Sequence, residues 1–107
     1  LNLVNCRLVD LLRGEIREGL TVSVRRGRIA GVGDGLEAAR TVDLRGMYLA
    51  PGLVDSHVHV ESSMLTPPEY ARLVVPRGTT AAVADPHEIA NVLGYDGMRY
   101  MIAASEG

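Results

Sequence analysis

The sequence predicts an α/β protein whose first half is built from β-strands and whose second half alternates strands with helices. Short apolar runs separated by glycines or polar turns fill residues 1–50, a pattern typical of strands. From residue 51 onward, a strand-like run, a helix-like run, a second strand-like run and further helix-like runs follow one another. This order is typical of βαβ units, which form parallel sheets with right-handed crossovers. We therefore expect two domains, residues 1–50 and residues 51–107.

The first half is expected to contain short strands joined by tight turns. The expected strands cover residues 3–8, 20–24, 28–32, 41–44 and 47–49. The pair Arg26-Gly27 fits a tight hairpin, because glycine supplies the positive φ that primed turns need. The pair Arg45-Gly46 repeats this signal. Both pairs are interpreted as structural turns rather than as ligand loops.

The second half opens with residues 53–60, an apolar run interrupted by three ionisable residues. This composition predicts a buried strand of a parallel sheet that is covered on both faces. Thr66 then resembles a helix cap, with Pro67 at the first helical position and Glu69 three residues after the cap. A helix is therefore expected over residues 67–75.

Gly78 is expected to end that helix, and the small, apolar residues 79–84 predict a second strand. Helical regions follow over residues 87–93 and 97–104. Two βα units cannot close a (β/α)8 barrel, which needs roughly 250 residues, so such a barrel would be represented by about its first quarter. Since the chain also starts at Leu1 without a methionine, we expect it to be part of a longer protein.

Composition excludes several classes of protein. A formal net charge of −2 gives no overall attraction to nucleic acid. No apolar run reaches the roughly 18 to 20 residues of a membrane span, and no signal-peptide pattern precedes the first strand, so a cytoplasmic protein is expected. The single cysteine, Cys6, cannot form an internal disulfide and is interpreted as a buried thiol. The chain contains no lysine, which removes any Schiff-base or carboxylated-lysine chemistry from this segment.

The chemistry is concentrated at His57 and His59, near the end of the strand predicted over residues 53–60. Residues two apart on a strand project to the same face, so both imidazoles can bind one divalent metal. Paired histidines also occur at surfaces and in cores without a metal. Asp55 and Glu61 continue the same alternation, and four polar groups on an apolar strand need partners that a metal would provide.

A second group of ionisable residues, Asp85, His87 and Glu88, directly follows the strand predicted over residues 79–84. Because the ends of parallel strands meet at one edge of a sheet, this group is expected beside the histidine pair. His87 and Glu88 could supply an acid, a base or a substrate contact, or could be ordinary first-turn residues. Asp85 is expected to cap the following helix.

Two segments resemble a known family. Residues 51–59, PGLVDSHVH, resemble the segment that opens the barrel in the amidohydrolase superfamily, and residues 24–33 resemble its preceding β-sandwich strands. Residues 57–94 are more specific and resemble the adenine deaminases of that superfamily. Dihydroorotases and hydantoinases usually carry arginine shortly after the histidine pair, where Glu61-Ser62-Ser63 stands here. The resemblance implies part of a β-sandwich followed by the first two βα units of a TIM-like barrel.

The resemblance also implies a reaction, the hydrolytic deamination of adenine to hypoxanthine and ammonia. It implies a binuclear divalent metal centre, with manganese or iron expected and zinc as an alternative, in which His57 and His59 bind one ion. Such an ion would make hydroxide available near neutral pH. Glu61, His87 and Glu88 match the family pattern at the rim and are the candidate catalytic residues, without individual roles.

Further parts of the site are expected outside this chain. Members of the family use a bridging carboxylate, two further histidines and an aspartate from later strands, and the sequence ends before any of them. The absence of lysine agrees with a centre bridged by glutamate. We therefore expect the 107 residues alone to be inactive without the rest of the parent polypeptide. Adenine is the expected partner, with no nucleic acid and no membrane. Related enzymes often form homo-oligomers, but nothing in the segment identifies an interface.

Two alternative readings remain at this point. One is another metal-dependent amidohydrolase, such as a cyclic amidase or a deacetylase, which would share the fold and the histidine pair but not the substrate. The other is a non-catalytic β-rich module whose histidines are merely buried. Substrate tests distinguish the first alternative, and metal analysis distinguishes the second.

Overall fold

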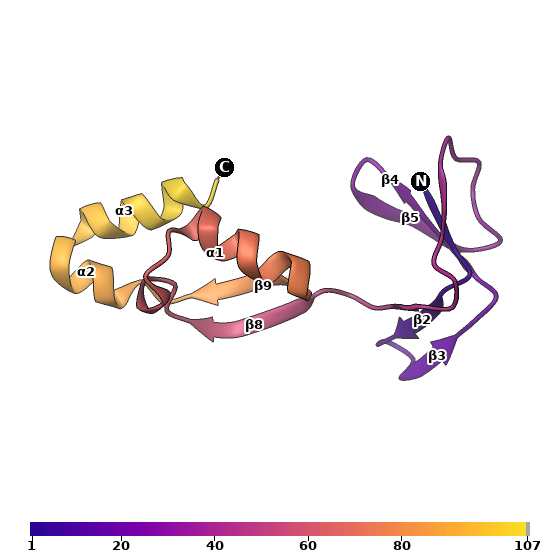
Figure 1. Cartoon of the computed structure of the whole chain (residues 1–107), viewed down its shortest axis with the longest axis horizontal. Helices are drawn as coiled ribbons and strands as arrows, with labels where there is room; N and C mark the ends of the chain where they lie inside the picture. Colours follow the sequence, from indigo (N-terminus) through magenta and orange to yellow (C-terminus); the bar gives the residue numbers. More distant parts are fainter. Residues whose placement is uncertain (107) are drawn as a thin grey trace. The chain divides into compact units, whose positions relative to one another are not determined.

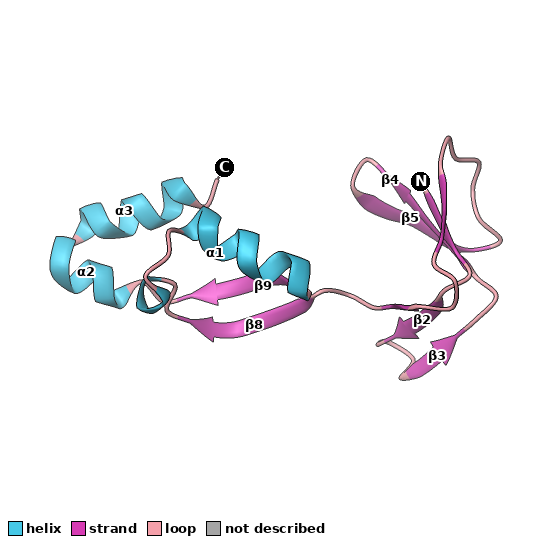
Figure 2. Cartoon of the chain, viewed as in Figure 1, coloured by secondary structure: helices cyan, strands magenta, loops and turns pink. Residues whose placement is uncertain are grey.

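The computed structural model describes residues 1–106 and forms two compact units (Figure 1). The first unit is Leu1–Pro51, and the second begins at Gly52. The first unit contains only strands and loops, whereas the second combines two strands with helices (Figure 2).

The first unit, which the structure describes completely, folds into two sheets. Its strands are β1 (Asn2–Val4), β2 (Arg7–Asp10), β3 (Glu15–Arg17), β4 (Thr21–Arg25), β5 (Arg28–Gly33), β6 (Thr41–Asp43) and β7 (Tyr48–Leu49). One sheet has the order β5-β4-β1-β6 and the other has the order β3-β2-β7. The pairs β1–β6 and β2–β7 are parallel, and the other neighbours are antiparallel. Cys6, Val22 and Ser23 are buried in this unit, so the expected burial of the thiol is confirmed.

Both predicted turns have the expected backbone. Arg26 and Gly27 have φ of 50° and 71°, and they join β4 to β5 as a hairpin. Arg45 and Gly46 have φ of 50° and 81°. However, this second turn joins β6 to β7, which lie in different sheets, so it is not a hairpin.

Two expectations in the first unit are wrong. The strand expected over residues 3–8 is divided into β1 and β2 at Asn5, whose φ is 54°. Asparagine adopts this left-handed conformation more readily than most residues, so it can redirect the chain inside an apolar run. Strand β3 was not expected, because the three residues Glu15–Arg17 contain a single apolar side chain and depend on pairing with β2.

The second unit is a β-α-β arrangement followed by two helices. Its elements are β8 (Leu53–Val58), the 3₁₀ turn η1 (Glu61–Ser63), α1 (Pro67–Val74), the 3₁₀ turn η2 (Val75–Arg77), β9 (Thr79–Ala84), α2 (His87–Leu93) and α3 (Tyr95–Ala104). β8 and β9 pair in parallel, with Asp55 opposite Ala82, so the predicted βαβ order is confirmed. Gly78, at φ 103°, ends the helical segment as expected. Among the described residues, no helix is long and apolar enough to cross a membrane.

Two details of the second unit differ from expectation. β8 is not buried on both faces, because Leu53 and Val54 are each 64% exposed and β9 is its only strand neighbour in the part of the chain that the structure describes. Thr66 is the N-cap of α1 by position, but its side chain makes no capping hydrogen bond. Pro67 and Pro68 occupy the first two helical positions and have no N–H, so fewer donors need a cap.

Candidate metal centre

The two histidines of the predicted pair lie together at the carboxyl end of β8. His57 is on the strand, and His59 follows directly after Val58, where the strand ends. Their Nε2 atoms are 3.0 Å apart, and their ring centroids are 4.8 Å apart. His57 is exposed and His59 is half-buried. The alternation of a strand therefore brings both imidazoles to the same side, where they can share a ligand.

A hydrogen bond from the neighbouring strand fixes the orientation of His59. Its Nδ1 lies 2.7 Å from the backbone carbonyl oxygen of Asp85. A carbonyl oxygen only accepts hydrogen bonds, so Nδ1 must carry the proton and donate it. In the tautomer with the proton on Nδ1, the lone pair is on Nε2, the atom that faces His57. The Asp85 N–H donates to the carbonyl oxygen of Val58 at 3.0 Å, which holds the ends of β8 and β9 together at this point.

The histidines belong to two overlapping groups whose possible ligand atoms lie within 4.8 Å of one another. One group is His57, His59 and Asp85, and the other is His59, His87 and Glu88. Imidazole nitrogens with a carboxylate oxygen suit zinc, iron or manganese. Two nitrogens each about 2.1 Å from one ion are about 3 Å apart when they subtend roughly a right angle, which matches the His57–His59 separation. The residues present therefore fit a divalent metal.

His59 cannot serve both groups at once. Its Nδ1 is committed to the Asp85 carbonyl, and the single lone pair on Nε2 can bind one ion. Since that atom already lies 3.0 Å from His57 Nε2, the pair of His57 and His59 is the better metal site. His87 and Glu88 then remain beside the metal site, where they are not needed as ligands.

The spacing predicts Glu61 on the same face of the strand as the histidines, but Glu61 lies outside β8. The strand ends at Val58 and the chain turns, so Glu61 is the first residue of η1. Its Oε1 accepts hydrogen bonds from the backbone N–H groups of Glu88 and Ile89, at 3.2 and 3.4 Å. Its Oε2 is buried and has no hydrogen-bond partner among residues 1–106. Asp55 is likewise engaged with backbone, since its Oδ1 accepts from the N–H of His57 at 3.2 Å.

The expected capping role of Asp85 is wrong. The N-cap position of α2 is Pro86, and it makes no side-chain capping bond. The carboxylate of Asp85 instead lies 3.2 Å from Nδ1 of His87. The first amides of α2, those of Glu88 and Ile89, donate to Glu61 instead.

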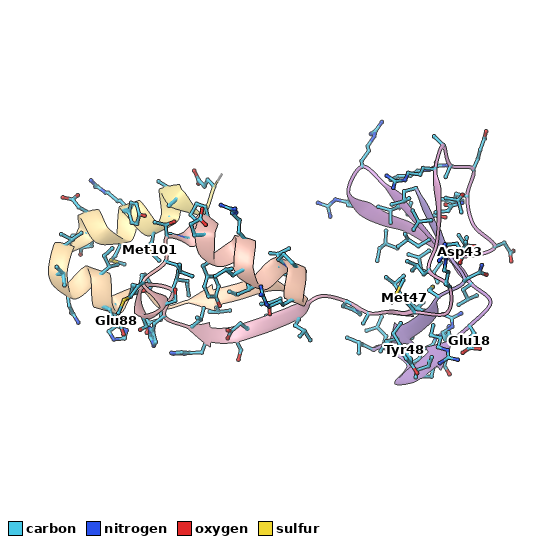
Figure 3. All side chains as sticks on the ribbon, viewed as in Figure 1. Glu18, Asp43, Met47, Tyr48, Glu88 and Met101 are labelled. Carbon is cyan, nitrogen blue, oxygen red and sulfur yellow. The ribbon has the colours of Figure 1, made fainter. Side chains whose placement is uncertain are left out.

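Glu88 lies at the start of α2, close to η1 (Figure 3). Its Oε1 accepts a hydrogen bond from the Ser62 hydroxyl at 2.7 Å. Ser62 was not among the candidate site residues. In the sequence, only its position directly after Glu61 points to Ser62. The contact between Ser62 and Glu88 is visible only in the folded chain.

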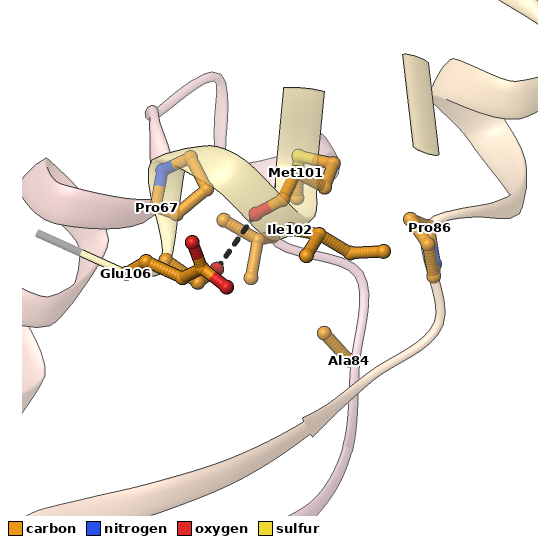
Figure 4. A pocket seen from close by; sticks show the side chains of 8 residues that line it. Pro67, Ala84, Pro86, Met101, Ile102 and Glu106 are labelled. Carbon is orange, nitrogen blue, oxygen red and sulfur yellow. Dashed lines mark hydrogen bonds between the residues drawn. The ribbon is translucent and has the colours of Figure 1, made fainter. Parts of the chain in front are cut away.

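A cavity of about 330 Å³ lies elsewhere in the second unit (Figure 4). Pro67, Pro86, Met101 and Ile102 are among the residues that line it, and Ser105 donates a hydrogen bond to the carbonyl oxygen of Met101 at its edge. None of the histidines lines this cavity. The candidate metal ligands therefore lie outside this cavity, at the ends of β8 and β9.

Comparison with known proteins identifies the family. A model described as the amidohydrolase family matches residues 48–107. The chain is 53% identical over 105 residues to an adenine deaminase of Kosmotoga olearia, and 54% identical over 105 residues to an adenine deaminase of Desulfatibacillum aliphaticivorans. Each alignment covers 98% of this chain and 18% of the relative, so the chain spans about a fifth of the length of these proteins.

Solved structures give a consistent result. A prolidase complexed with N-methylphosphonate-L-proline is similar with a TM-score of 0.60 and 26% identity, over 85% of this chain and 28% of that protein. A second structure, described as an uncharacterized protein, is similar with a TM-score of 0.61 and 27% identity, over 85% of this chain and 28% of that protein. Because the family model covers more than half of the 107 residues, this chain belongs to the amidohydrolase family.

Proposed function

We propose that the protein carrying this chain is a metal-dependent adenine deaminase. The observation that supports adenine as the substrate is the identity of about 50% to curated adenine deaminases over nearly the whole chain. In the reaction, water replaces the exocyclic amine of adenine, giving hypoxanthine and ammonia. Since the chain spans about a fifth of those relatives, it would contribute one part of the active site.

We assign the architecture in the same way. Residues 1–50 would form part of a β-sandwich, and β8-α1-β9-α2 would form the first two βα units of a TIM-like barrel. The parallel pairing of β8 with β9 and the match to the amidohydrolase model support this assignment. Catalytic sites of such barrels lie at the carboxyl ends of the strands, where His57 and His59 are found.

His57 and His59 would hold a divalent ion, with manganese or iron proposed in a binuclear centre and zinc as the alternative. Such an ion supplies a water molecule of lowered pKa for hydrolysis near neutral pH. The chain's own contribution is the orientation of the ligands. The Asp85 carbonyl holds His59 with its lone pair directed at His57, and such supporting bonds raise metal affinity.

Glu88 and His87 would handle protons and substrate contacts. Deamination needs a proton on the departing amine, and a carboxylate beside the metal site can carry it there from the attacking water. The Glu88 carboxylate is held by Ser62, and His87 is paired with Asp85. Both side chains are exposed beside the histidine cluster, so a bound substrate could reach them.

The test uses the full-length protein that contains this chain, purified with manganese or iron. Ammonia release would be measured with adenine and, at equal concentration, with guanine, cytosine, hydantoin and dihydroorotate, and chromatography would identify hypoxanthine. A dipeptide ending in proline is included because of the similarity to a prolidase structure. Turnover of adenine at least about 100-fold above the others is expected. Preference for a cyclic amide or the dipeptide would overturn the assignment.

A non-catalytic role is tested by metal content. The full-length protein is expected to retain metal through gel filtration and to lose both metal and activity after treatment with a chelator. A protein that is purified without metal, and whose properties are unchanged by His57→Ala, would instead be a structural module.

A further inference from the structure

Glu61 and Ser62 connect the carboxyl end of β8 with the segment that follows β9. Both residues lie in η1, directly after the histidine pair, and both side chains reach α2. α2 in turn carries His87 and Glu88 in its first turn. The link therefore connects the metal ligands of β8 with the ionisable residues that follow β9.

Glu61 replaces the missing cap of α2. The helix begins after Pro86, which provides no capping side chain, and two of its first amides donate to Glu61 Oε1 instead. A carboxylate at this end is also stabilised by the positive end of the helix dipole. The partner oxygen, Oε2, is buried. A carboxylate with one oxygen held by backbone and the other shielded from solvent is poorly placed to exchange protons with a substrate.

Ser62 binds the carboxylate of Glu88. Its hydroxyl donates to Glu88 Oε1 at 2.7 Å, a short distance typical of a hydrogen bond to a charged acceptor. Glu88 is otherwise exposed, and a free glutamate side chain samples several rotamers. The serine therefore selects the rotamer in which Glu88 lies next to His59 and His87.

We propose that Glu61 and Ser62 are positioning residues: Glu61 fixes the first turn of α2, and Ser62 orients the Glu88 carboxylate. This changes the role expected for Glu61 from catalytic to positioning. The part concerning Glu88 rests on the proposed function, whereas the part concerning the helix does not.

The first experiment measures hydrogen exchange of α2 in the full-length protein. Glu61→Ala removes the acceptor, so the amides of Glu88 and Ile89 are expected to exchange about fivefold faster or more. Glu61→Gln keeps an acceptor oxygen and should retain most of the protection. Glu69→Ala is the matched control, because its carboxylate binds Arg72 on α1. Equal exchange in wild type and Glu61→Ala would overturn the capping role, whatever the substrate is.

The second experiment measures turnover of adenine and metal content. Ser62→Ala is expected to lower kcat by about 100-fold, the cost of a misplaced catalytic group, with KM changed less than about threefold and metal content unchanged. Ser62→Thr retains the hydroxyl and should restore most of kcat. The neighbouring Ser63→Ala is the control, because the Ser63 hydroxyl bonds to the Val60 carbonyl in its own turn.

The outcomes separate this inference from the proposed function. A wild-type protein inactive on adenine contradicts the proposed function and leaves the exchange experiment as the test of Glu61. An active wild type in which Ser62→Ala behaves like Ser63→Ala overturns the role of Ser62. Loss of turnover in Glu61→Gln, with α2 still protected, would show that Glu61 is catalytic and overturn its positioning role.

Discussion

The imidazole of His59 donates a hydrogen bond from Nδ1 to the backbone carbonyl oxygen of Asp85, across a distance of 2.7 Å. This contact joins the end of β8 to the end of β9, two segments that are separated by 26 positions in the sequence. It also decides which nitrogen of His59 is available, because the donating atom cannot bind a metal. The remaining Nε2 faces His57.

Metal content should therefore distinguish the two overlapping groups of ligands. His57→Ala or His59→Ala removes a nitrogen from the facing pair, so metal affinity of the full-length protein is expected to fall by about 100-fold or more. His87→Ala leaves the pair intact and should change the affinity by less than about tenfold. Titration with manganese or zinc after chelation measures the affinities. An equal loss in His87→Ala would favour the group that contains Glu88.

Asp85 should act mainly through its backbone. Asp85→Asn keeps the carbonyl that holds His59, but it weakens the pairing with His87. We expect metal content to be preserved while kcat on adenine falls by about fivefold, because a pairing between half-exposed charged side chains contributes at most about 1 kcal/mol. Metal analysis and steady-state kinetics check this. Loss of the ion in Asp85→Asn would mean that the carboxylate is a third ligand.

Features set by neighbouring residues were predictable from sequence. The Arg26-Gly27 hairpin follows from the φ values that the turn needs, and the adjacent placement of His57 and His59 follows from the period of a strand. The position of α1 was also predicted to within one residue, from Pro67 to Val74.

Features that depend on distant partners were not predictable. An Asp-Pro pair before a helix favours capping by the aspartate, yet the tertiary structure brings Glu61 to those amides from 27 positions away. The short strand β3 has the same origin, since Glu15–Arg17 is a strand only because β2 lies beside it. Neither contact can be predicted from the residues that are near it in the sequence.

Gly52 should be intolerant of any side chain. A Cβ added there would clash with Thr80 Oγ1 and lie 2.6 Å from Thr80 Cβ, and rotating the threonine cannot relieve the second clash. Gly52→Ala is expected to lower the free energy of unfolding by about 2 kcal/mol, measured by denaturant titration. Adding Thr80→Gly should recover part of this loss. Gly31→Ala is the control, since its nearest neighbour, a Leu36 carbon, is 3.8 Å away; equal losses would contradict this account.

The 107-residue chain alone should not deaminate adenine. The described residues bring only the imidazoles of His57 and His59 together as the proposed metal ligands, and the chain spans about a fifth of the length of its relatives. A site with too few ligands holds metal weakly and leaves the substrate in open solvent. No ammonia above the blank is expected from the purified chain with added manganese or iron. Metal-dependent release of ammonia from adenine would refute this expectation.

Asp10 should make the β2–β3 hairpin sensitive to acid. Partial burial would raise the pKa of Asp10, but hydrogen bonds from the Arg13 N–H and the Arg17 guanidinium outweigh it and hold this pKa below its ordinary value. Because the pKa of the unfolded chain is about 3.9, the stabilisation is complete above that pH and is lost as the pH falls through the lower folded value.

Hydrogen exchange of the β2–β3 hairpin, corrected for the intrinsic effect of pH, measures this loss. Protection in the wild type is expected to be constant from pH 7 to about pH 4.5 and to fall at lower pH. Asp10→Asn cannot titrate, so its protection should be lower at pH 7 and should approach that of the wild type in acid. Asp96→Asn, at a side chain 88% exposed on α3, is the control and should leave the hairpin unchanged. If Asp10→Asn retained the full acid dependence of the wild type, another group would have to be responsible, because the amide has no proton to gain in this range.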